Sequence, residues 1–288
     1  MVNEGGILLA GGSGTRLFPN TKFLNKHLLP IYDKPMIFYS LSILMLSEIR
    51  NITIVCNPKD ENSYKSLLGD GGEFGLDLYY SIQEKPEGIP HAINTALEKN
   101  NYDKFTVALG DNFLYGQDFF NNLKQTFLNS KNPVIYYQRV GKPENFGIIK
   151  RQNKLILDII EKPLNFISNE AVIGLYIFDS EFSEHFQKLK KSKRLEFEIV
   201  DLIKHYGLEN VESNFVGRGT AWFDMGSNDD FYNCTQFVKT IQDRQGLLVC
   251  SPHEIALRNG WVTESEIFSN MKLFKNSEYY SNLKKSIS

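Results

Sequence analysis

The sequence predicts an α/β fold with a mostly parallel central sheet flanked by helices. Short apolar runs at 6–10, 51–56 and 105–109 alternate with segments of helical periodicity in the N-terminal part of the chain. Such alternation is typical of parallel sheets with right-handed crossovers. Glycine or polar residues follow these runs, and ligands of such folds gather beyond the carboxyl ends of the strands. We therefore expect a binding site at that edge of the sheet.

Length and composition bound the class of protein. The chain has 288 residues, of which 42% are hydrophobic, enough for one large domain or two smaller ones. A net charge of −2 gives no broad basic field, so we do not expect nucleic acid as a partner. No apolar run reaches the roughly 20 residues of a membrane span, and the N-terminus lacks the features of a signal peptide. Three cysteines without a Cys-x-x-Cys pair favour a reduced, cytoplasmic setting.

In the first half of the chain, β-branched and apolar runs indicate strands, and longer periodic segments indicate helices. Pro35 can open one helix at its first turn, and Asp60 or Asn62 could cap the next. We expect strands at 6–10, 51–56, 76–82 and 105–109, and helices at 36–47, 60–68 and 92–97.

Beyond residue 132 strands follow one another without long helices between them. We expect strands at 134–140, 147–151, 155–160, 172–178, 211–216 and 221–224, and helices at 180–190 and 197–205. The segment from 228 to 288 looks helical. The chain is therefore divided into a core at 1–227, with a subregion inserted into its second half, and a C-terminal helical extension at 228–288.

The stretch from Gly6 to Leu17 combines a buried strand, a glycine loop and a cation. Glycines at 11, 12 and 14 let the backbone approach a ligand closely, and exposed N–H groups in such a loop bind anions. Arg16 adds a forked set of donors that suits phosphate. The combination indicates a nucleotide-phosphate site, although the glycines alone are equally consistent with a tight turn that binds nothing.

Two other phosphate-binding loops compete with this interpretation. A P-loop needs a Lys-Ser/Thr pair after its glycines, and none follows here. Gly12 and Gly14 match the first two positions of a dinucleotide fingerprint, but Leu17 occupies the third. Asp33 lies at about the distance expected for the ribose-binding acid, so a dinucleotide site is disfavoured but stays open.

Two further motifs follow the glycine loop. Gly-Gly-Ser-Gly-Thr-Arg-Leu at 11–17, Lys-His-Leu-Leu-Pro at 26–30 and Asp-Lys-Pro-Met-Ile at 33–37 occur in order within forty residues. Together they resemble the sugar-1-phosphate nucleotidyltransferases, and most closely the glucose-1-phosphate thymidylyltransferase group. The resemblance extends to about residue 256, through Arg-Gln-Gly-Leu at 244–247 and Pro-His-Glu-Ile-Ala at 252–256.

The resemblance implies a Rossmann-like nucleotidyltransferase core in which the inserted subregion binds sugar. It also implies an activity: dTTP and glucose 1-phosphate would be joined, with Mg²⁺ as cofactor, to give dTDP-glucose and pyrophosphate. The implied assembly is a homotetramer with a separate regulatory nucleotide site.

Two acids are candidates for binding the metal. Asp111 follows a buried strand directly, and a hard oxygen ligand there suits Mg²⁺, although a turn or cap aspartate is commoner in general. The family has the same Leu-Gly-Asp-Asn sequence at this point. Asp224 stands in Trp-Phe-Asp-Met-Gly, where the family provides the second metal carboxylate.

The resemblance also assigns nucleotide contacts. Gln83 and Gly88 match positions that contact the pyrimidine base, and an amide can pair with the imide edge of thymine or uracil. His91 and His27 stand where the family usually has glutamine, and we expect both to pack or to form hydrogen bonds. The nucleotide-binding residues implied are Leu9, Gly11, Gly12, Ser13, Gly14, Thr15, Arg16, Gln83, Pro86, Gly88 and Asp111.

Sugar-phosphate contacts are implied by later motifs. The tripeptide Glu-Lys-Pro occurs twice, at 84–86 and 161–163, and only its order and context assign the second copy to the sugar site. Val172 would line the sugar pocket, although a plain core strand explains it as well. The residues implied are Asn112, Gly147, Glu161, Lys162, Val172 and Trp222.

The expected mechanism needs no nucleophilic side chain, because a sugar 1-phosphate is already an anionic nucleophile. It would attack the α-phosphate in line, and the protein would align and neutralise charge. The expected catalytic residues are Arg16, Lys26, Lys162 and Asp111. Three alternatives stay open: a UTP-using or other sugar nucleotidyltransferase, a catalytically silent regulatory homologue, and a dinucleotide oxidoreductase.

Overall fold

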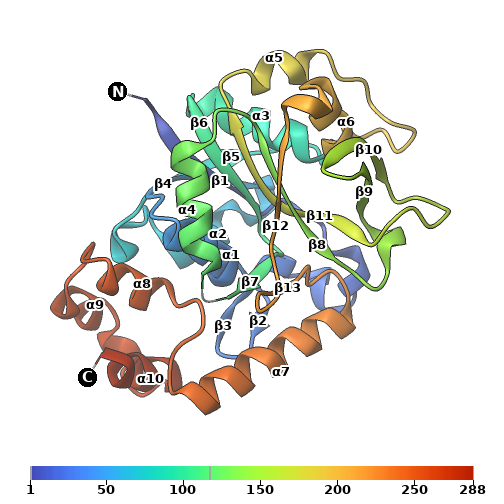
Figure 1. Cartoon of the computed structure of the whole chain (residues 1–288). Coiled ribbons are helices and arrows are strands. Elements are labelled where there is room, and N and C mark those ends of the chain that lie inside the picture. Colours follow the sequence, from blue (N-terminus) through green and yellow to red (C-terminus); the bar gives the residue numbers. More distant parts are fainter. Residues whose placement is uncertain (1, 117, 288) are drawn as a thin grey trace.

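A sheet of nine strands forms the centre of the computed structural model, which describes residues 2–116 and 118–287 (Figure 1). Strands β10 and β11 run opposite to the other seven, so the sheet is mixed but mostly parallel, as predicted. The main path of the sheet contains, in spatial order, β10 (Leu155–Glu161), β9 (Gly147–Gln152), β11 (Glu170–Asp179), β6 (Lys104–Leu109), β1 (Glu4–Leu9), β4 (Asn51–Cys56) and β5 (Asp77–Ile82). Off this path β8 (Val134–Arg139) pairs with β11, and β12 (Glu212–Phe215) pairs with β8.

The four neighbouring strands β6, β1, β4 and β5 are parallel and end at one edge of the sheet. Their registers place side by side Leu109, Leu9, Val55 and Ser81. The residues that follow these positions, including the glycine loop, Gln83 and Asp111, therefore emerge at the same edge. This confirms the predicted location of the strand ends.

Helices cover both faces of the sheet, because β1 is apolar on both sides. Leu8 packs into one core cluster, whereas Ile7 and Leu9 pack into the other. The first cluster includes residues of α1 (Met36–Leu46), α2 (Glu61–Leu68) and α4 (Phe119–Asn129). The second includes residues of α3 (Ile89–Lys99), α5 (Phe182–Gln187) and α6 (Ile199–His205). This is the layer arrangement of an α/β fold.

The inserted subregion is attached to the long strand β11. Its second half, from Leu175 to Asp179, pairs with β6, whereas its first half extends past the carboxyl end of β6. There Ala171 pairs with Ile148 of β9. The antiparallel hairpin of β9 and β10 thus stands beyond the strand ends that carry the glycine loop.

Two short ribbons complete the strands. β7 (Phe113–Tyr115) pairs with β13 (Ala221–Phe223), and β2 (Pro30–Ile31) pairs with β3 (Lys34–Pro35). Neither β7 nor α4 was predicted, although the buried residues Phe119, Leu123 and Phe127 of α4 recur at helical spacing. The predicted helices at 180–190 and 197–205 are both shorter in the structure. The intervening segment turns, with Ser192 N–H donating to Glu196 O and Leu195 in a left-handed conformation (φ 63°).

The C-terminal segment is helical, as predicted, and it packs against the core (Figure 1). Buried Lys34 donates to Asp33 at 2.6 Å, and Gln242 of the first C-terminal helix donates to the same carboxylate at 3.0 Å. Asp33 is therefore part of a buried network rather than a free ribose-binding acid. The helices are α7 (Asn228–Gln245), α8 (Pro252–Arg258), α9 (Glu264–Asn270) and α10 (Glu278–Ile287).

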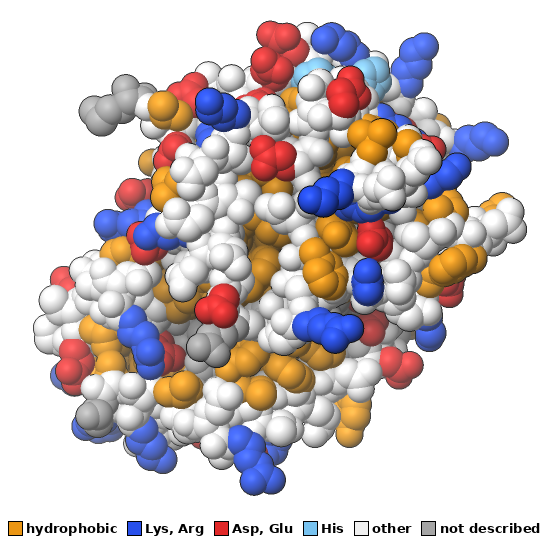
Figure 2. Space-filling model, in the orientation of Figure 1, with side chains coloured by type: hydrophobic (Ala, Val, Ile, Leu, Met, Phe, Trp, Pro, Cys, Tyr) orange, Lys and Arg blue, Asp and Glu red, His pale blue; other side chains and the backbone are white. Residues whose placement is uncertain are grey.

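The division at 227/228 stays a prediction, and its ranges include residues 1, 117 and 288, which lie outside the described part. Asp60 is the N-cap of α2 by position, but its side chain does not cap the helix. Its carboxylate instead accepts a hydrogen bond from Asn25 at 2.7 Å. Within the described residues, no helix has both the length and the apolar character that membrane crossing requires. On the face in Figure 2, basic and acidic side chains are interspersed.

Candidate active site

The glycine loop leaves β1 with its backbone donors unused. The N–H groups of residues 11–14 donate to no described residue, whereas Gly110 N–H is bonded to Leu9 O at 2.8 Å. Gly14 has φ +63°, and a Cβ there would lie 2.9 Å from Cβ of Lys26. Adjacent free donors in one loop can bind several oxygens of a phosphate chain.

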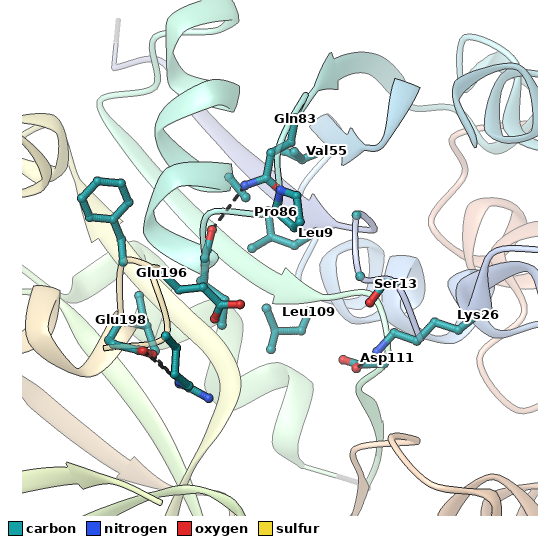
Figure 3. A pocket seen from close by; sticks show the side chains of 18 of the residues that line it. Leu9, Ser13, Lys26, Val55, Gln83, Pro86, Leu109, Asp111, Glu196 and Glu198 are labelled. Carbon is teal, nitrogen blue, oxygen red and sulfur yellow. Dashed lines mark hydrogen bonds and ion pairs between the residues drawn. The ribbon is translucent and has the colours of Figure 1, made fainter. Parts of the chain in front are cut away.

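This loop forms part of the wall of a cavity of about 360 Å³, here called the first cavity (Figure 3). Its walls come from the strand ends of the parallel half of the sheet, from the start of α3 and from the segment before α6. It brings together many residues predicted from distant motifs: Leu9, Gly11, Gly12, Ser13, Lys26, Gln83, Pro86, Gly88, Asp111, Glu161 and Lys162.

An ion pair joins two of the predicted catalytic residues in this cavity. The Lys26 ammonium donates to the Asp111 carboxylate, and Figure 3 shows the two side chains pointing at one another. Lys26 opens a 3₁₀ turn (Lys26–Leu28) whose N-cap is Asn25. Burial acts to raise the pKa of Asp111, but the Lys26 ammonium and hydrogen bonds outweigh it, and the pKa is lowered. Asp111 is thus ionised and can act as an anionic ligand.

His27 lies beside this pair but is held by hydrogen bonds. Burial and the neighbouring Lys26 lower the pKa of His27 to about 3, so the ring is neutral. Its Nδ1 is 2.8 Å from Asn25 Oδ1 and 3.3 Å from the Tyr64 hydroxyl. This geometry agrees with the expected packing and hydrogen-bonding role.

The β7–β13 ribbon brings the second predicted acid toward the first. Phe113 pairs with Phe223, so Asn112 and Asp224 leave the ribbon at the same end. Burial raises the pKa of Asp224 to about 6, with further contributions from Asp230 and Asp111. The ribbon thus brings the segments that carry the two acids to the same end, which the sequence could not establish.

Asp224 lines a second cavity, of about 910 Å³, together with Arg16 and Trp222. A Cβ at Gly226 would lie 2.8 Å from Nη2 of Arg16 and 3.4 Å from Oδ2 of Asp224. The guanidinium and the carboxylate therefore both face Gly226, where a side chain would crowd the guanidinium. Arg16 lines this second cavity, whereas Gly11, Gly12 and Ser13 of the loop line the first.

Hydrogen bonds through Asn112 link Asp111, which lines the first cavity, to Trp222, which lines the second. The indole Nε1–H of Trp222 donates to Asn112 Oδ1 at 2.6 Å, and the ring packs on Phe146 with centroids 5.4 Å apart. Asn112 also donates to Asp111 Oδ1 at 3.2 Å. These contacts fix an aromatic face and an amide next to the acid pair.

Charged groups gather at one end of the first cavity, here called the sugar end. Lys162 follows β10 with φ +46°, and its N–H donates to Phe146 O at 2.9 Å. Its ammonium lies 3.8 Å from Glu161, which Arg194 also approaches at 3.5 Å. Burial raises the pKa of Glu161 although both cations act against it. A Cβ at Gly147 would lie 3.2 Å from Glu161 Oε2, so a side chain there would crowd this carboxylate.

The other end, here called the base end, is formed by Gln83 and the start of α3. Gln83 is 5% exposed and donates to Gly88 O at 3.4 Å. Gly88 has φ +103°, and a Cβ there would lie 2.2 Å from Phe197 O. Only glycine fits this close contact between the loop and the segment before α6.

The structure leaves some predicted residues outside both cavities and adds others. Val172 lies in β11, is 8% exposed and packs in the core cluster with Ile149 and Ile159. The predicted set also includes Gly14, Thr15, Asn112 and Gly147, which do not line either cavity. The residues that sequence reasoning missed line the first cavity: Arg194, Glu196, Phe197 and Glu198. Their signal was the unexplained basic-then-acidic run at 190–198.

Comparison with known proteins identifies the family of this chain. The family model described as Nucleotidyl transferase matches residues 5–241. A glucose-1-phosphate thymidylyltransferase of Neisseria meningitidis is 40% identical over 95% of this chain and 96% of its own, and one of Mycobacterium tuberculosis is 37% identical over 95% and 96%. A crystal structure from Bacillus anthracis that bears the same enzyme name and contains a sucrose superimposes with TM-score 0.74 at 34% identity, covering 81% of this chain and 94% of that one. The chain therefore belongs to the nucleotidyl transferase family, and within it to the glucose-1-phosphate thymidylyltransferase group.

Proposed function

We propose that this chain joins dTTP and glucose 1-phosphate to give dTDP-glucose and pyrophosphate, with Mg²⁺ as cofactor. One observation carries the proposal. The unused donors of the glycine loop, the Lys26–Asp111 pair and the cations of the sugar end all belong to one cavity. A cavity with phosphate-binding groups at the expected positions of both substrates suits transfer of a nucleotidyl group from a triphosphate to a sugar phosphate.

The reaction asks the protein for alignment and charge neutralisation. The sugar phosphate forms a new P–O bond to the α-phosphate while the bond to the leaving pyrophosphate breaks. The nucleophile is already ionised, so no general base is needed. His27 supports this, because a pKa lowered to about 3 makes its ring a weak base.

The cations have separate roles in this proposal. The loop donors of the first cavity and Arg16, which reaches in from the second cavity, would hold the triphosphate and the leaving pyrophosphate. Lys26 and Lys162 hold the attacking phosphate. Arg194 joins Lys162 in that role, which the sequence had not suggested; it lines the same cavity within reach of Glu161.

Asp111 and Asp224 would hold Mg²⁺. Their oxygens are hard ligands, and Mg²⁺ typically binds through one or two carboxylates plus substrate phosphates. Among the described residues, no group of three acidic, histidine or cysteine side chains could hold a metal alone, which fits a site completed by substrate. The raised pKa of Asp224 also fits, because clustered carboxylates gain from a shared cation. Bound Mg²⁺ would neutralise charge on the α-phosphate and the attacking oxygen.

The remaining predicted residues would contact the two organic groups. At the base end Leu9 and Pro86 provide apolar wall, and Gln83 and Gly88 provide polar contacts. At the sugar end Glu161 would accept hydrogen bonds from the sugar hydroxyls. The other sugar contacts proposed are Asn112, Trp222, Gly147 and Val172. Asn112 and Trp222 are hydrogen-bonded to each other, whereas Gly147 and Val172 lie near the starts of β9 and β11, where these two strands pair.

Assembly and location are also proposals. A homotetramer with a regulatory nucleotide site follows from the family resemblance, and light scattering of the purified chain would give a mass about four times that of one chain. A cytoplasmic location is in keeping with three cysteines that are all free and buried.

The decisive experiment offers the purified chain a mixture of nucleoside triphosphates and sugar 1-phosphates with Mg²⁺ and identifies the products by mass spectrometry. We expect dTDP-glucose as the main product. Predominance of a UDP-sugar would favour the UTP-using alternative. Absence of every sugar nucleotide, despite measurable dTTP binding, would favour a silent homologue. A thermal shift with NAD would revive the oxidoreductase alternative.

A further inference from the structure

We propose that His91 is a positioning residue that turns the carbonyl oxygen of the Gln83 amide toward the first cavity. This inference rests on the proposed function, since it concerns how the nucleotide's base is chosen. The base end would then select a base that presents an imide N–H, as thymine and uracil do. Cytosine, which presents a bare ring nitrogen there, would be rejected.

The contacts of Gln83 define which way its amide faces. Its Nε2 lies 2.9 Å from His91 Nδ1 and 3.4 Å from Gly88 O. An amide nitrogen has two protons, and these two acceptors use both. Its Oε1 points instead toward the glycine loop, where a Cβ at Gly11 would lie 3.3 Å away. The oxygen is therefore the atom left for a ligand.

The contact with Gly88 alone cannot hold this orientation firmly, because it is long for a hydrogen bond. The bond to His91 is the short one. If His91 Nδ1 carried a proton, the amide would rotate to offer Oε1 to it, and Nε2 would face the cavity. Whether His91 Nδ1 accepts or donates a hydrogen bond therefore decides whether the Gln83 amide presents an acceptor or a donor to the base.

The His91 ring is itself held in place. Its plane stacks on Phe197 at an angle of 17°, with centroids 6.5 Å apart. Its Nε2 lies 3.8 Å from the Glu87 carboxylate, which favours a proton on that nitrogen and leaves Nδ1 as the acceptor. Glu87 is fixed in turn by Lys191 at 2.7 Å, and Phe197 N–H donates to Glu87 O at 2.8 Å.

The test compares nucleotide binding rather than catalysis. Dissociation constants for dTTP and dCTP are measured by calorimetry with Mg²⁺ and without sugar phosphate. The wild-type chain should prefer dTTP. His91→Leu leaves Gln83 free to rotate, so the preference should shrink by about tenfold, the scale of losing one hydrogen-bond match. His91→Gln can still supply an acceptor and should keep most of the preference.

A matched control exists in α5. His185 makes the same contact with a glutamate, 3.8 Å from Glu181, and packs on the Tyr206 ring, but it does not line the first cavity. His185→Leu should leave the dTTP/dCTP ratio unchanged. If His91→Leu weakens the binding of both nucleotides equally, or changes neither, the ratio of dissociation constants stays the same. That result would overturn the inference and leave His91 a structural role.

A second measurement reads the protonation of His91 in the wild-type chain and uses a variant only for assignment. ¹⁵N spectra of histidine-labelled wild-type chain, assigned with His91→Gln, should show Nδ1 of His91 without a proton; a protonated Nδ1 would contradict the inference. The two proposals fail separately. A chain that makes no dTDP-glucose but loses base preference in His91→Leu overturns the function and keeps the inference. Product formation with an unchanged ratio does the reverse.

Discussion

The tripeptide Glu-Lys-Pro occurs at both ends of the first cavity, yet its two copies differ in backbone conformation and burial. In the copy at 84–86 all three residues are exposed beyond the edge strand β5. In the copy at 161–163 the glutamate is half-buried and the proline is buried. There Lys162 adopts a left-handed backbone, a conformation uncommon for residues other than glycine.

The partner strand explains the difference. Glu161 is still paired with Gly147 of β9, and the Lys162 N–H reaches Phe146 O. The first copy follows Gln83, whose N–H makes the last bond to the neighbouring strand at Cys56 O. Identical residues therefore acquire a fixed geometry where the sheet continues and stay in solvent where it ends. Backbone strain retained at one copy is the kind of feature that clusters at functional sites.

The most severe test of this comparison is made at Asp111, which lines the cavity shared by both copies. Asp111→Asn removes a negative ligand while keeping the side chain's shape. We expect turnover to fall by at least about 10²-fold, comparable to loss of one strong electrostatic stabiliser. Steady-state rates at saturating Mg²⁺ measure this, and near wild-type rates there would remove Asp111 from the proposed metal site.

Lys162→Ala tests the copy that the sheet fixes. Both the ground state and the transition state lose a cation, so the Michaelis constant for glucose 1-phosphate should rise and turnover should fall, each by roughly tenfold. The melting temperature should change little, because the ammonium is half-exposed. Binding of dTTP alone should be nearly unaffected. A loss confined to dTTP binding would show that Lys162 contacts the triphosphate and not the sugar phosphate.

Gln83→Ala sharpens the comparison at the base end. Use of dTTP and UTP should weaken by about tenfold, the scale of a lost hydrogen bond in a buried site. The Michaelis constant for glucose 1-phosphate should change much less. Kinetics with each substrate varied in turn give both values. Equal losses for the two substrates would point to a structural role for this buried amide.

Lys85→Ala gives the smallest expected effect and is the matched control for Lys162→Ala. An exposed lysine in a turn should tolerate replacement within about 0.5 kcal/mol of unfolding free energy and without kinetic change. Denaturant unfolding and the same steady-state assay suffice. If the two lysine variants behave alike, the assignment of the sugar phosphate to the second copy is wrong.

The sequence predicted the parts of the fold that depend on local pattern. The apolar strands at 51–56 and 105–109, the glycine loop and the helical C-terminal segment are confirmed by the structure. The short strand β7 was not predicted, because three residues carry too little periodicity. The position of the β9–β10 hairpin also could not be predicted, since it depends on how far β11 extends past β6.

The sequence could predict which residues belong to the candidate site but not how they are arranged. Motifs named Lys26 and Asp111, yet nothing in the sequence says that they form an ion pair. Arg194 escaped notice because its role depends on a turn at Leu195 rather than on a motif. The placement of Arg16 with Asp224 in the second cavity, instead of in the first, likewise depends on tertiary contacts.

The ribbon of β7 and β13 makes the relative position of Asp111 and Asp224 independent of the length of the chain between them. Asn112 and Trp222 are 110 positions apart, yet three residue pairs set how Asp111 and Asp224 approach each other. The excursion between them, which contains α4 and the β9–β10 hairpin, can therefore gain or lose residues in its exposed loops without moving either carboxylate. A slip of one residue in the ribbon would instead turn Asp224 to the opposite face. We expect such a deletion within 221–223 to abolish activity in a chain that still unfolds cooperatively, whereas a deletion in an exposed loop of the excursion should be tolerated.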